Sequence, residues 1–229
     1  YVAAIAIQGG DTLNRTGGAL ATKPHIVGYQ AAGIVREVGE GVTAFTKGQQ
    51  VVATMGFGSH AEVISVPAAA VWAVPAGLSL QEAAGIPIEF GTADDCLFEF
   101  GRLKAGESVL IQAGASGVGL AGIQLAKAAG ATVLATASSD ERLERLKEYG
   151  LDHGINYTKV DAAKEVLEYT NGAGVNLVVD SVGGSTLEGS VAMLAYRGRI
   201  SWVGRAGREP RPPEIGAIMG KNASITGVF

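Results

Sequence analysis

The 229-residue chain is poor in the residues that build covalent and metal-held scaffolds, with one cysteine and three histidines. A single cysteine, Cys96, excludes a disulfide framework and is typical of a reducing compartment, so we expect a cytoplasmic protein. A structural zinc site takes four ligands, and a catalytic one takes three and an open position. His25, His60 and His153 are not at ligand spacing. We therefore expect no metal, and each histidine in a loop or on the surface.

Charge is also scarce. Only 17% of the residues are charged and the formal net charge is −4, without the clustered Lys and Arg of a nucleic-acid surface. The two long uncharged runs, Val63–Gln81 and Ser108–Ala126, are interrupted by prolines or glycines, so neither predicts a membrane-spanning helix. No signal-peptide pattern and no initiator methionine stands at the start. We expect a soluble protein that is an internal fragment or lacks its N-terminal strands.

The most informative stretch is Ser108–Ala129, where a buried-strand pattern, a turn of small residues and a helical pattern follow without a gap. Such a turn brings backbone N–H groups to a pyrophosphate at a helix N-terminus. The residues that we assign to this contact are Gly114, Ser116, Gly117, Val118 and Gly119. Because Ser116 replaces the second glycine of the usual fingerprint, an ordinary strand–helix turn of a flavodoxin-like sheet remains an alternative.

The rest of the chain changes character near Leu78. Before it, short β-type runs separated by Gly, Pro and Thr predict a small antiparallel barrel or sandwich, with a last strand at Gly58–Val66. After it, Ser79 and Glu82 form a capping-box pattern, and a second helix is expected over Thr92–Phe100. Six strands then alternate with helices, which predicts a doubly wound parallel sheet. The last strand, Ser224–Val228, follows a proline-rich loop at Pro210–Pro213.

The end of the second strand of that sheet indicates which dinucleotide binds. An NAD site usually has an acid there, whereas this strand ends in Ser138-Ser139 and Arg142 and Arg145 follow. This pattern favours the 2′-phosphate of NADP. Two alternatives remain: Asp140 could hold the ribose, and Ser138 with Glu141 could simply be a capping box.

Segments spread over nearly the whole chain resemble the zinc-independent, zeta-crystallin-like quinone oxidoreductases of the medium-chain dehydrogenase/reductase superfamily. They are Gln8–Arg15, Gly28–Gly33, Gly39–Val42, Lys47–Val51, Gly58–Glu62, Glu82–Pro87, Lys104–Gly119, Asn156-Tyr157 and Asp180–Gly184. The chain differs from the family on the substrate side, where Gln8, Leu13, Gln30, Asp94 and Arg205 stand in place of the usual residues. It is also shorter at both ends.

The resemblance implies an incomplete GroES-like catalytic domain over residues 1–86 and a Rossmann NADP-binding domain over residues 87–229. It implies that NADPH binds through the glycine turn, with a 2′-phosphate site at Ser138, Arg142 and Tyr157. Contacts to the pyrophosphate and nicotinamide are implied for Thr92, Gly117, Val118, Ser181 and Gly204. It also implies a homodimer through sheet edges, for which Ser224–Val228 is the natural strand.

The expected activity is NADPH-dependent hydride transfer to a quinone or α,β-unsaturated carbonyl, without zinc. We assign catalytic roles to Gln8, Asp11 and Thr92, although Asp11 could equally cap a local Gly-Gly-Asp-Thr turn. Cys96 is expected to be a packed core thiol. Two other functions stay open: an enoyl-thioester reductase excised from a larger synthase, and a low-turnover NADPH-binding redox sensor or structural protein.

Overall fold

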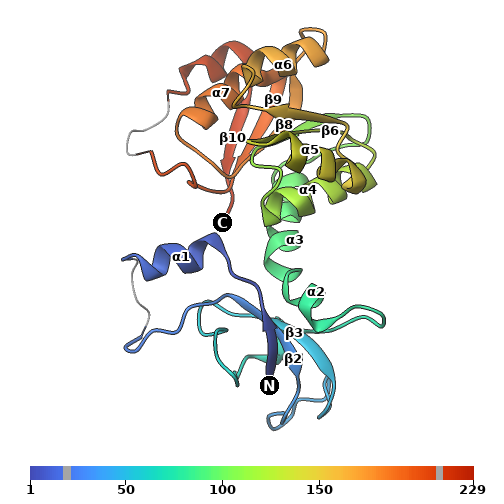
Figure 1. Ribbon diagram of the computed structural model, residues 1–229, viewed down its shortest axis with the longest axis vertical. Coiled ribbons are helices and arrows are strands. Elements are labelled where there is room, and N and C mark those ends of the chain that lie inside the picture. Colours follow the sequence, from blue (N-terminus) through green and yellow to red (C-terminus); the bar gives the residue numbers. More distant parts are fainter. Residues whose placement is uncertain (18–21, 210–213) are drawn as a thin grey trace. The chain divides into compact units, whose positions relative to one another are not determined.

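The computed structural model describes residues 1–17, 22–209 and 214–229 (Figure 1). These residues form two compact units, 1–89 and 90–229, which we describe separately. The proline-rich loop expected at 210–213 lies outside the described residues. Among the helices that the structure describes, none combines the length and the apolar character needed to cross a bilayer.

The first unit is built on a four-stranded antiparallel sheet of order β1-β2-β3-β4. The strands are β1 (Val2–Ile5), β2 (Gln30–Ile34), β3 (Gln50–Thr54) and β4 (Val71–Ala73). A short 3₁₀ helix, η1 (Ala68–Ala70), precedes β4, and helix α2 (Leu80–Ala84) packs on the sheet through Ala83 and Ala84. The predicted capping box is confirmed, because the Ser79 hydroxyl accepts from the Glu82 amide at 3.2 Å.

Two expectations for this unit are wrong. The segment 58–66 is not a strand, although Val2 N donates to Glu62 O at 2.9 Å, because a single bond does not make a ladder. The alternative in which Asp11 caps a local Gly-Gly-Asp-Thr turn is wrong about the turn, because this segment is the first part of helix α1 (Gly9–Arg15), but the capping itself is confirmed. Asp11 stabilises the start of this helix by accepting a hydrogen bond from Gln8 N at 2.8 Å.

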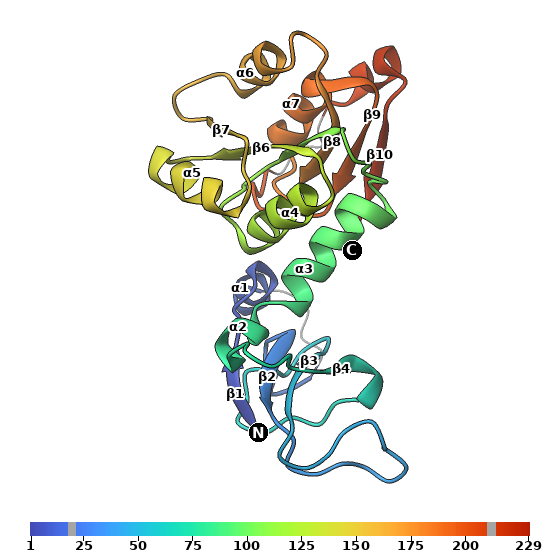
Figure 2. The same cartoon turned by 90° about the vertical axis from the view of Figure 1, so that its right-hand side faces the viewer.

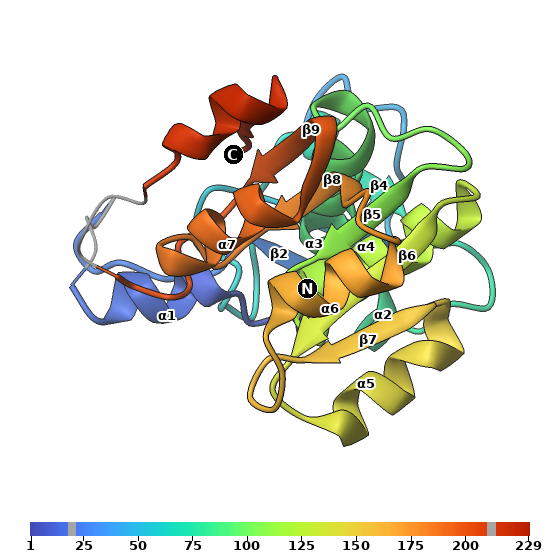
Figure 3. The ribbon, with the colours of Figure 1, turned by 90° about the horizontal axis from the view of Figure 1, so that it is seen from above.

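The second unit contains a six-stranded parallel sheet of order β10-β9-β8-β5-β6-β7, which confirms the predicted doubly wound fold. The strands are β5 (Ser108–Ile111), β6 (Thr132–Ala137), β7 (His153–Asn156), β8 (Val175–Asp180), β9 (Leu194–Trp202) and β10 (Ser224–Gly227). Figure 3 follows this sheet from β9 through β8 and β5 to β6 and β7. The crossover from β7 to β8 makes the neighbours β5 and β8 the switch point of the sheet.

Helices cover both faces of this sheet. They are α3 (Pro87–Asp94), which continues as the π-helical turn η2 (Asp95–Glu99), then α4 (Gly117–Ala128), α5 (Asp140–Leu146), η3 (Lys147–Tyr149), α6 (Ala162–Tyr169), α7 (Ser185–Met193) and η4 (Gly216–Lys221). In Figure 2, α4 and α5 lie below the sheet, and α6 and α7 lie above it. Along β5, Val109 and Ile111 point to the face covered by α4 and α5, and Leu110 points to the face covered by α6 and α7, as the pleat requires.

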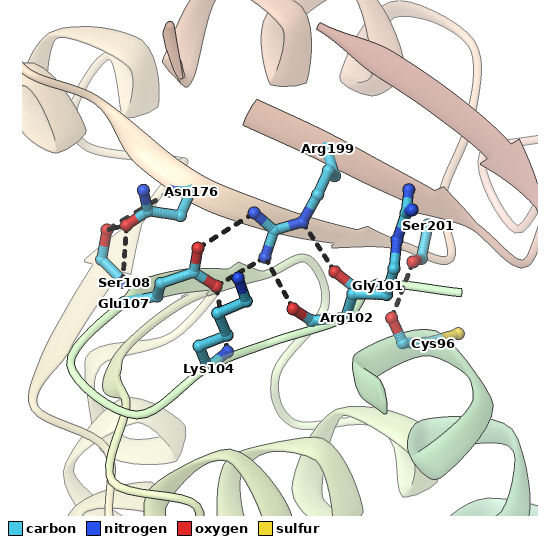
Figure 4. A network of polar contacts seen from close by, with 9 residues as sticks. All are labelled: Cys96, Gly101, Arg102, Lys104, Glu107, Ser108, Asn176, Arg199 and Ser201. Carbon is cyan, nitrogen blue, oxygen red and sulfur yellow. Dashed lines mark hydrogen bonds and ion pairs between the residues drawn. The ribbon is translucent and has the colours of Figure 1, made fainter. Parts of the chain in front are cut away.

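A network around Arg199 of β9 holds the loop that leads into β5 (Figure 4). The Arg199 guanidinium donates to both carboxylate oxygens of Glu107, at 3.1 and 2.6 Å, and to Gly101 O at 2.6 Å. Beside it, the amide of Ser108 donates to Asn176 Oδ1 at 2.9 Å, which joins β5 to β8. The start of β5, the strand that leads into the glycine turn, is therefore fixed by side-chain contacts as well as by the backbone hydrogen bonds of the sheet.

Candidate functional site

A cavity of about 590 Å³ lies at the carboxyl ends of β5 and β6 in the second unit. In an open parallel sheet, this edge beside the switch point is where ligands bind. The cavity is lined by four of the residues that the sequence assigns to the cofactor: Ser116, Ser138, Arg142 and Tyr157. Ser116 directly precedes α4, Ser138 follows β6, Arg142 lies on α5 and Tyr157 follows β7, so the fold gathers residues that are up to 41 positions apart.

The glycine turn ends at an open helix N-terminus. Ser116 caps α4, because its hydroxyl accepts from Gly119 N at 3.1 Å. A Cβ on Gly119 would lie 2.5 Å from Ala113 O, so this glycine is required for packing within the turn. Gly117 is exposed, and the amides of Gly117 and Val118, as the first of the helix, have no intrahelical acceptor. The turn therefore presents free amides and no side chain at one exposed point.

The three residues expected at the 2′-phosphate lie together in the cavity lining. The predicted capping box at Ser138 is wrong, because α5 is capped by Ser139, whose hydroxyl accepts from Arg142 N at 3.4 Å. Asp140 accepts hydrogen bonds from Lys159 Nζ and Asn156 Nδ2, both at 2.5 Å, and the Lys159 bond is the main cause that lowers the pKa of this carboxyl. Asp140 does not line the cavity and is paired with Lys159, which argues against its alternative role as the ribose acid.

The ends of β8 and β9 bring Ser181 and Gly204 together. A Cβ on Gly204 would lie 2.5 Å from Ser181 O, so only glycine allows these two strand ends to approach so closely. Asp180 holds the loop after β8 by accepting from the amides of Val182 and Gly183 at 2.9 and 2.8 Å. Thr92 lies on α3 in this same unit.

A buried polar chain beneath the cavity was missed by the sequence reasoning. Asp180 accepts from Ser190 Oγ at 3.0 Å, Ser190 Oγ accepts from Gln112 Nε2 at 3.2 Å, and Gln112 Oε1 accepts from Thr136 Oγ1 at 2.7 Å. It joins the carboxyl ends of β8, β5 and β6. The signal was present in the sequence, since Asp180 and Thr136 are polar residues at the ends of apolar strands.

The first unit holds the other two predicted catalytic residues, Gln8 and Asp11. Gln8 Nε2 donates to Glu89 Oε1 at 2.6 Å, and Gln30, which is 0% exposed, donates from Nε2 to Glu89 Oε2 at 2.6 Å. Gln30 Oε1 accepts from Ile88 N at 2.9 Å. Gln30 is neutral, but it is hydrogen-bonded to a carboxylate, that of Glu89, which was not selected from the sequence.

Asp11 is 1% exposed and lies beside His60. His60 Nε2 is 3.7 Å from Asp11 Oδ2, and neither Nε2 nor Asp11 Oδ1 has a hydrogen-bond partner. The hydroxyl of the fully buried Ser59 also has none. His60 is in a loop, as expected, but its Nε2 is buried rather than at the surface.

Models of two protein families match this chain. The alcohol dehydrogenase GroES-like domain matches residues 1–76, and the zinc-binding dehydrogenase model matches residues 117–229. Escherichia coli quinone oxidoreductase, solved with NADPH, superposes with a TM-score of 0.91 at 31% identity, covering 98% of this chain and 70% of that chain. This chain belongs to the medium-chain dehydrogenase/reductase superfamily, among its quinone-oxidoreductase-like members.

Two curated relatives of this superfamily member differ in size. A 2-haloacrylate reductase from a Burkholderia species is 36% identical over 205 residues, which cover 88% of this chain and 62% of that protein. A highly reducing polyketide synthase from Didymella fabae is 37% identical over 181 residues, which cover 78% of this chain and 10% of the synthase. The chain thus spans less than two thirds of either relative.

Potential metal-binding side chains are dispersed in the part of the chain that the structure describes. Across residues 1–17, 22–209 and 214–229, no three His, Cys, Asp or Glu side chains are grouped so as to hold one metal ion. His153 is the first residue of β7, with its side chain 24% exposed; its Nε2 lies 3.0 Å from Glu165 Oε1 and the ring stacks on Tyr169. Its role is to join β7 to α6.

We expect Cys96 to be unreactive in the folded protein. The thiol is 0% exposed, and burial is the main cause that raises its pKa to about 12, so very little thiolate exists at neutral pH. Mass spectrometry after iodoacetamide treatment near pH 8 should find no adduct on the native protein and full alkylation in denaturant. Fast labelling of the native protein would contradict the buried position.

Proposed function

We propose that this medium-chain reductase uses NADPH to deliver hydride to a quinone or an α,β-unsaturated carbonyl compound, without zinc. The observation that carries the proposal is the shared cavity lining of Ser138, Arg142 and Tyr157. A guanidinium and two hydroxyls suit a phosphate dianion, and the carboxylate that could compete, Asp140, is paired with Lys159. The NADPH held by the Escherichia coli relative adds support.

The residues present fit this cofactor. The amides of Gly117 and Val118 would hold the pyrophosphate at the positive end of α4, and Gly204 and Ser181 are proposed to contact the nicotinamide half. Bound NADPH supplies the hydride, and the protein supplies orientation and a dry environment. Gln8, Asp11 and Thr92 are proposed to act on the substrate side.

The substrate class is supported by chemistry and by the relatives. A quinone or a conjugated carbonyl delocalises the negative charge that hydride addition creates onto its own oxygen, so a strong Lewis acid is not required. The names of the Escherichia coli and Burkholderia relatives both describe conjugated acceptors.

Reduction of an enoyl thioester is the second candidate function. It is favoured by the 37% identity to a segment of the Didymella fabae polyketide synthase. An enoyl thioester is itself an α,β-unsaturated carbonyl, so the two candidates differ in the group that carries the acceptor and not in the redox step.

Steady-state oxidation of NADPH with a benzoquinone, a short enone and crotonyl thioester separates these functions. Turnover with the first two acceptors is expected. A strong preference for the thioester would favour the second candidate. Tight NADPH binding without turnover of any acceptor would contradict both and indicate a binding protein.

Replacing Arg142 should change cofactor preference. Arg142→Ala is expected to weaken NADPH binding about tenfold, the scale of one charge-assisted hydrogen bond, and to leave NADH binding unchanged. The matched control is Arg145→Ala, since Arg145 is also on α5 but does not line the cavity. Calorimetric titration with both cofactors measures the effect, and an equal loss for NADPH and NADH would refute the 2′-phosphate assignment.

We also propose that the protein forms a homodimer. β10 is an edge strand of the parallel sheet and pairs only with β9 among the described residues. Its free edge supports pairing with a second copy.

A further inference from the structure

The first unit contains a polar cluster of five side chains: Gln8, Asp11, Gln30, His60 and Glu89. Hydrogen bonds connect them in a row, from Gln30 to Glu89, from Gln8 to Glu89, and from the Gln8 amide to Asp11, and His60 follows Asp11 at 3.7 Å. Within the described residues, no Lys or Arg nitrogen lies within 4.0 Å of either carboxylate. The cluster thus holds two carboxylates without a permanent cation.

Such an arrangement lowers the stability of the fold, so folding by itself does not account for it. The buried carboxylate of Asp11 has no Lys or Arg beside it, and its Oδ1 has no hydrogen-bond partner. No contact replaces the hydration that this oxygen loses on folding. His60 is the one titratable cation of the described residues within 4.0 Å of it. Buried polar atoms without a hydrogen-bond partner are rare in folded proteins, and a catalytic role is one explanation for them.

The two ring nitrogens of His60 have different surroundings. Nε2 is buried without a hydrogen-bond partner and faces Asp11. Nδ1 is not buried in this way, and the side chain is 21% exposed. The His60 amide donates to Val27 O at 3.1 Å, which anchors the loop beside β2. Tyr29, also beside this loop, has its hydroxyl occupied by Asn14 Nδ2 at 2.9 Å. The imidazole therefore has one nitrogen directed to a buried carboxylate and the other available to a ligand.

We infer that His60 donates the proton that completes substrate reduction and that Asp11 is the residue that positions it. This inference rests on the proposed function. Reduction of a conjugated carbonyl adds a hydride, which brings both electrons, and one proton. The Nδ1–H bond of the imidazolium breaks, the proton forms a new bond to the enolate carbon or oxygen, and neutral His60 regains a proton from water. Asp11 faces Nε2, so Nδ1 is the nitrogen that donates, and in the neutral ring Asp11 keeps the proton on Nε2.

The first test replaces the donor. His60→Gln keeps a polar side chain that cannot titrate, and we expect kcat with an enone to fall about 100-fold, the usual scale of general acid catalysis, with unchanged NADPH affinity. In the unmodified protein kcat/KM should decline as the pH rises and the donor loses its proton, and this decline should be absent in the variant. The matched control is His153→Gln, which removes a carboxylate-paired histidine from the second unit.

The second test examines the His60–Asp11 pair by NMR, without substrate turnover. The ¹⁵N chemical shifts of the His60 ring should show a neutral form protonated on Nε2, and Asp11→Asn should shift the population toward the other tautomer. Glu165→Gln should alter His153 and not His60. If His60→Gln fails to fold, the Asp11→Asn spectra still decide.

Activity and an unchanged pH profile in His60→Gln, or identical His60 shifts in Asp11→Asn, would overturn the inference alone. NADPH binding without reduction of any acceptor by the unmodified protein would instead refute the proposed function.

Discussion

Gly117→Val is expected to lower affinity for NADPH and NADH alike by about 1,000-fold, which in practice abolishes binding. Gly117 is the exposed first residue of α4, and its amide and that of Val118 are the free donors of the turn. A valine side chain would hold the pyrophosphate away from both amides, and no other donor pair replaces them. Calorimetry with each cofactor measures the loss.

The control for this experiment distinguishes loss of the site from loss of the fold. Gly220→Val adds the same side chain at an exposed glycine of η4 with open space around it, and it should bind NADPH normally. Gly119→Val should fail differently, because its Cβ would lie 2.5 Å from Ala113 O and would disrupt the turn itself. Circular dichroism should therefore be native for Gly117→Val. Unchanged affinity in that variant would place the dinucleotide elsewhere.

Much of the second unit could be predicted because its signals are local. The largely apolar run Val175–Asp180 forms β8, and the alternation of strands and helices predicts the parallel sheet. The first unit was less predictable. Helix α1 begins with two glycines, which have poor helix propensity, and depends on the Asp11 carboxylate for its N-terminal bond.

The candidate site shows the same difference between local and long-range signals. The glycine turn was selected from its own spacing and Arg142 from its place after the second strand, whereas Ser138 and Tyr157 were expected from the family resemblance. Glu89 and His60 were missed because their importance comes from contacts between distant segments: Gln8 and Glu89 are 81 positions apart. The Gln112 chain was missed for the same reason, since Gln112 and Ser190 are 78 positions apart. No local pattern encodes such pairs.

Arg199→Met is expected to lower the free energy of unfolding of the second unit by about 3 kcal/mol, the lower end for breaking a buried ion pair. Its side chain is 17% exposed and that of Glu107 is 21% exposed, and methionine replaces none of the bonds to Glu107 and Gly101 (Figure 4). Trp202, at the end of β9, reports on this unit. Urea unfolding followed by its fluorescence, in a Trp72→Phe background that removes the other tryptophan, measures the change.

The same substitution should change how stability depends on pH. The hydrogen bond from Arg199 is the main cause that lowers the pKa of Glu107 below its ordinary 4.5, and the weaker effect of burial opposes it. Because the folded-state pKa is the lower one, this stabilisation is complete above about pH 4.5 and is lost as the pH falls through the folded-state pKa. The difference between the unmodified protein and Arg199→Met should therefore be constant near neutrality and shrink in acid. Lys147→Met, which removes an exposed pair with Glu144, should change stability by less than about 0.5 kcal/mol at either pH. A gap that persists undiminished in acid would show that Arg199 acts through the carbonyls of Gly101 and Arg102 rather than through the Glu107 carboxylate.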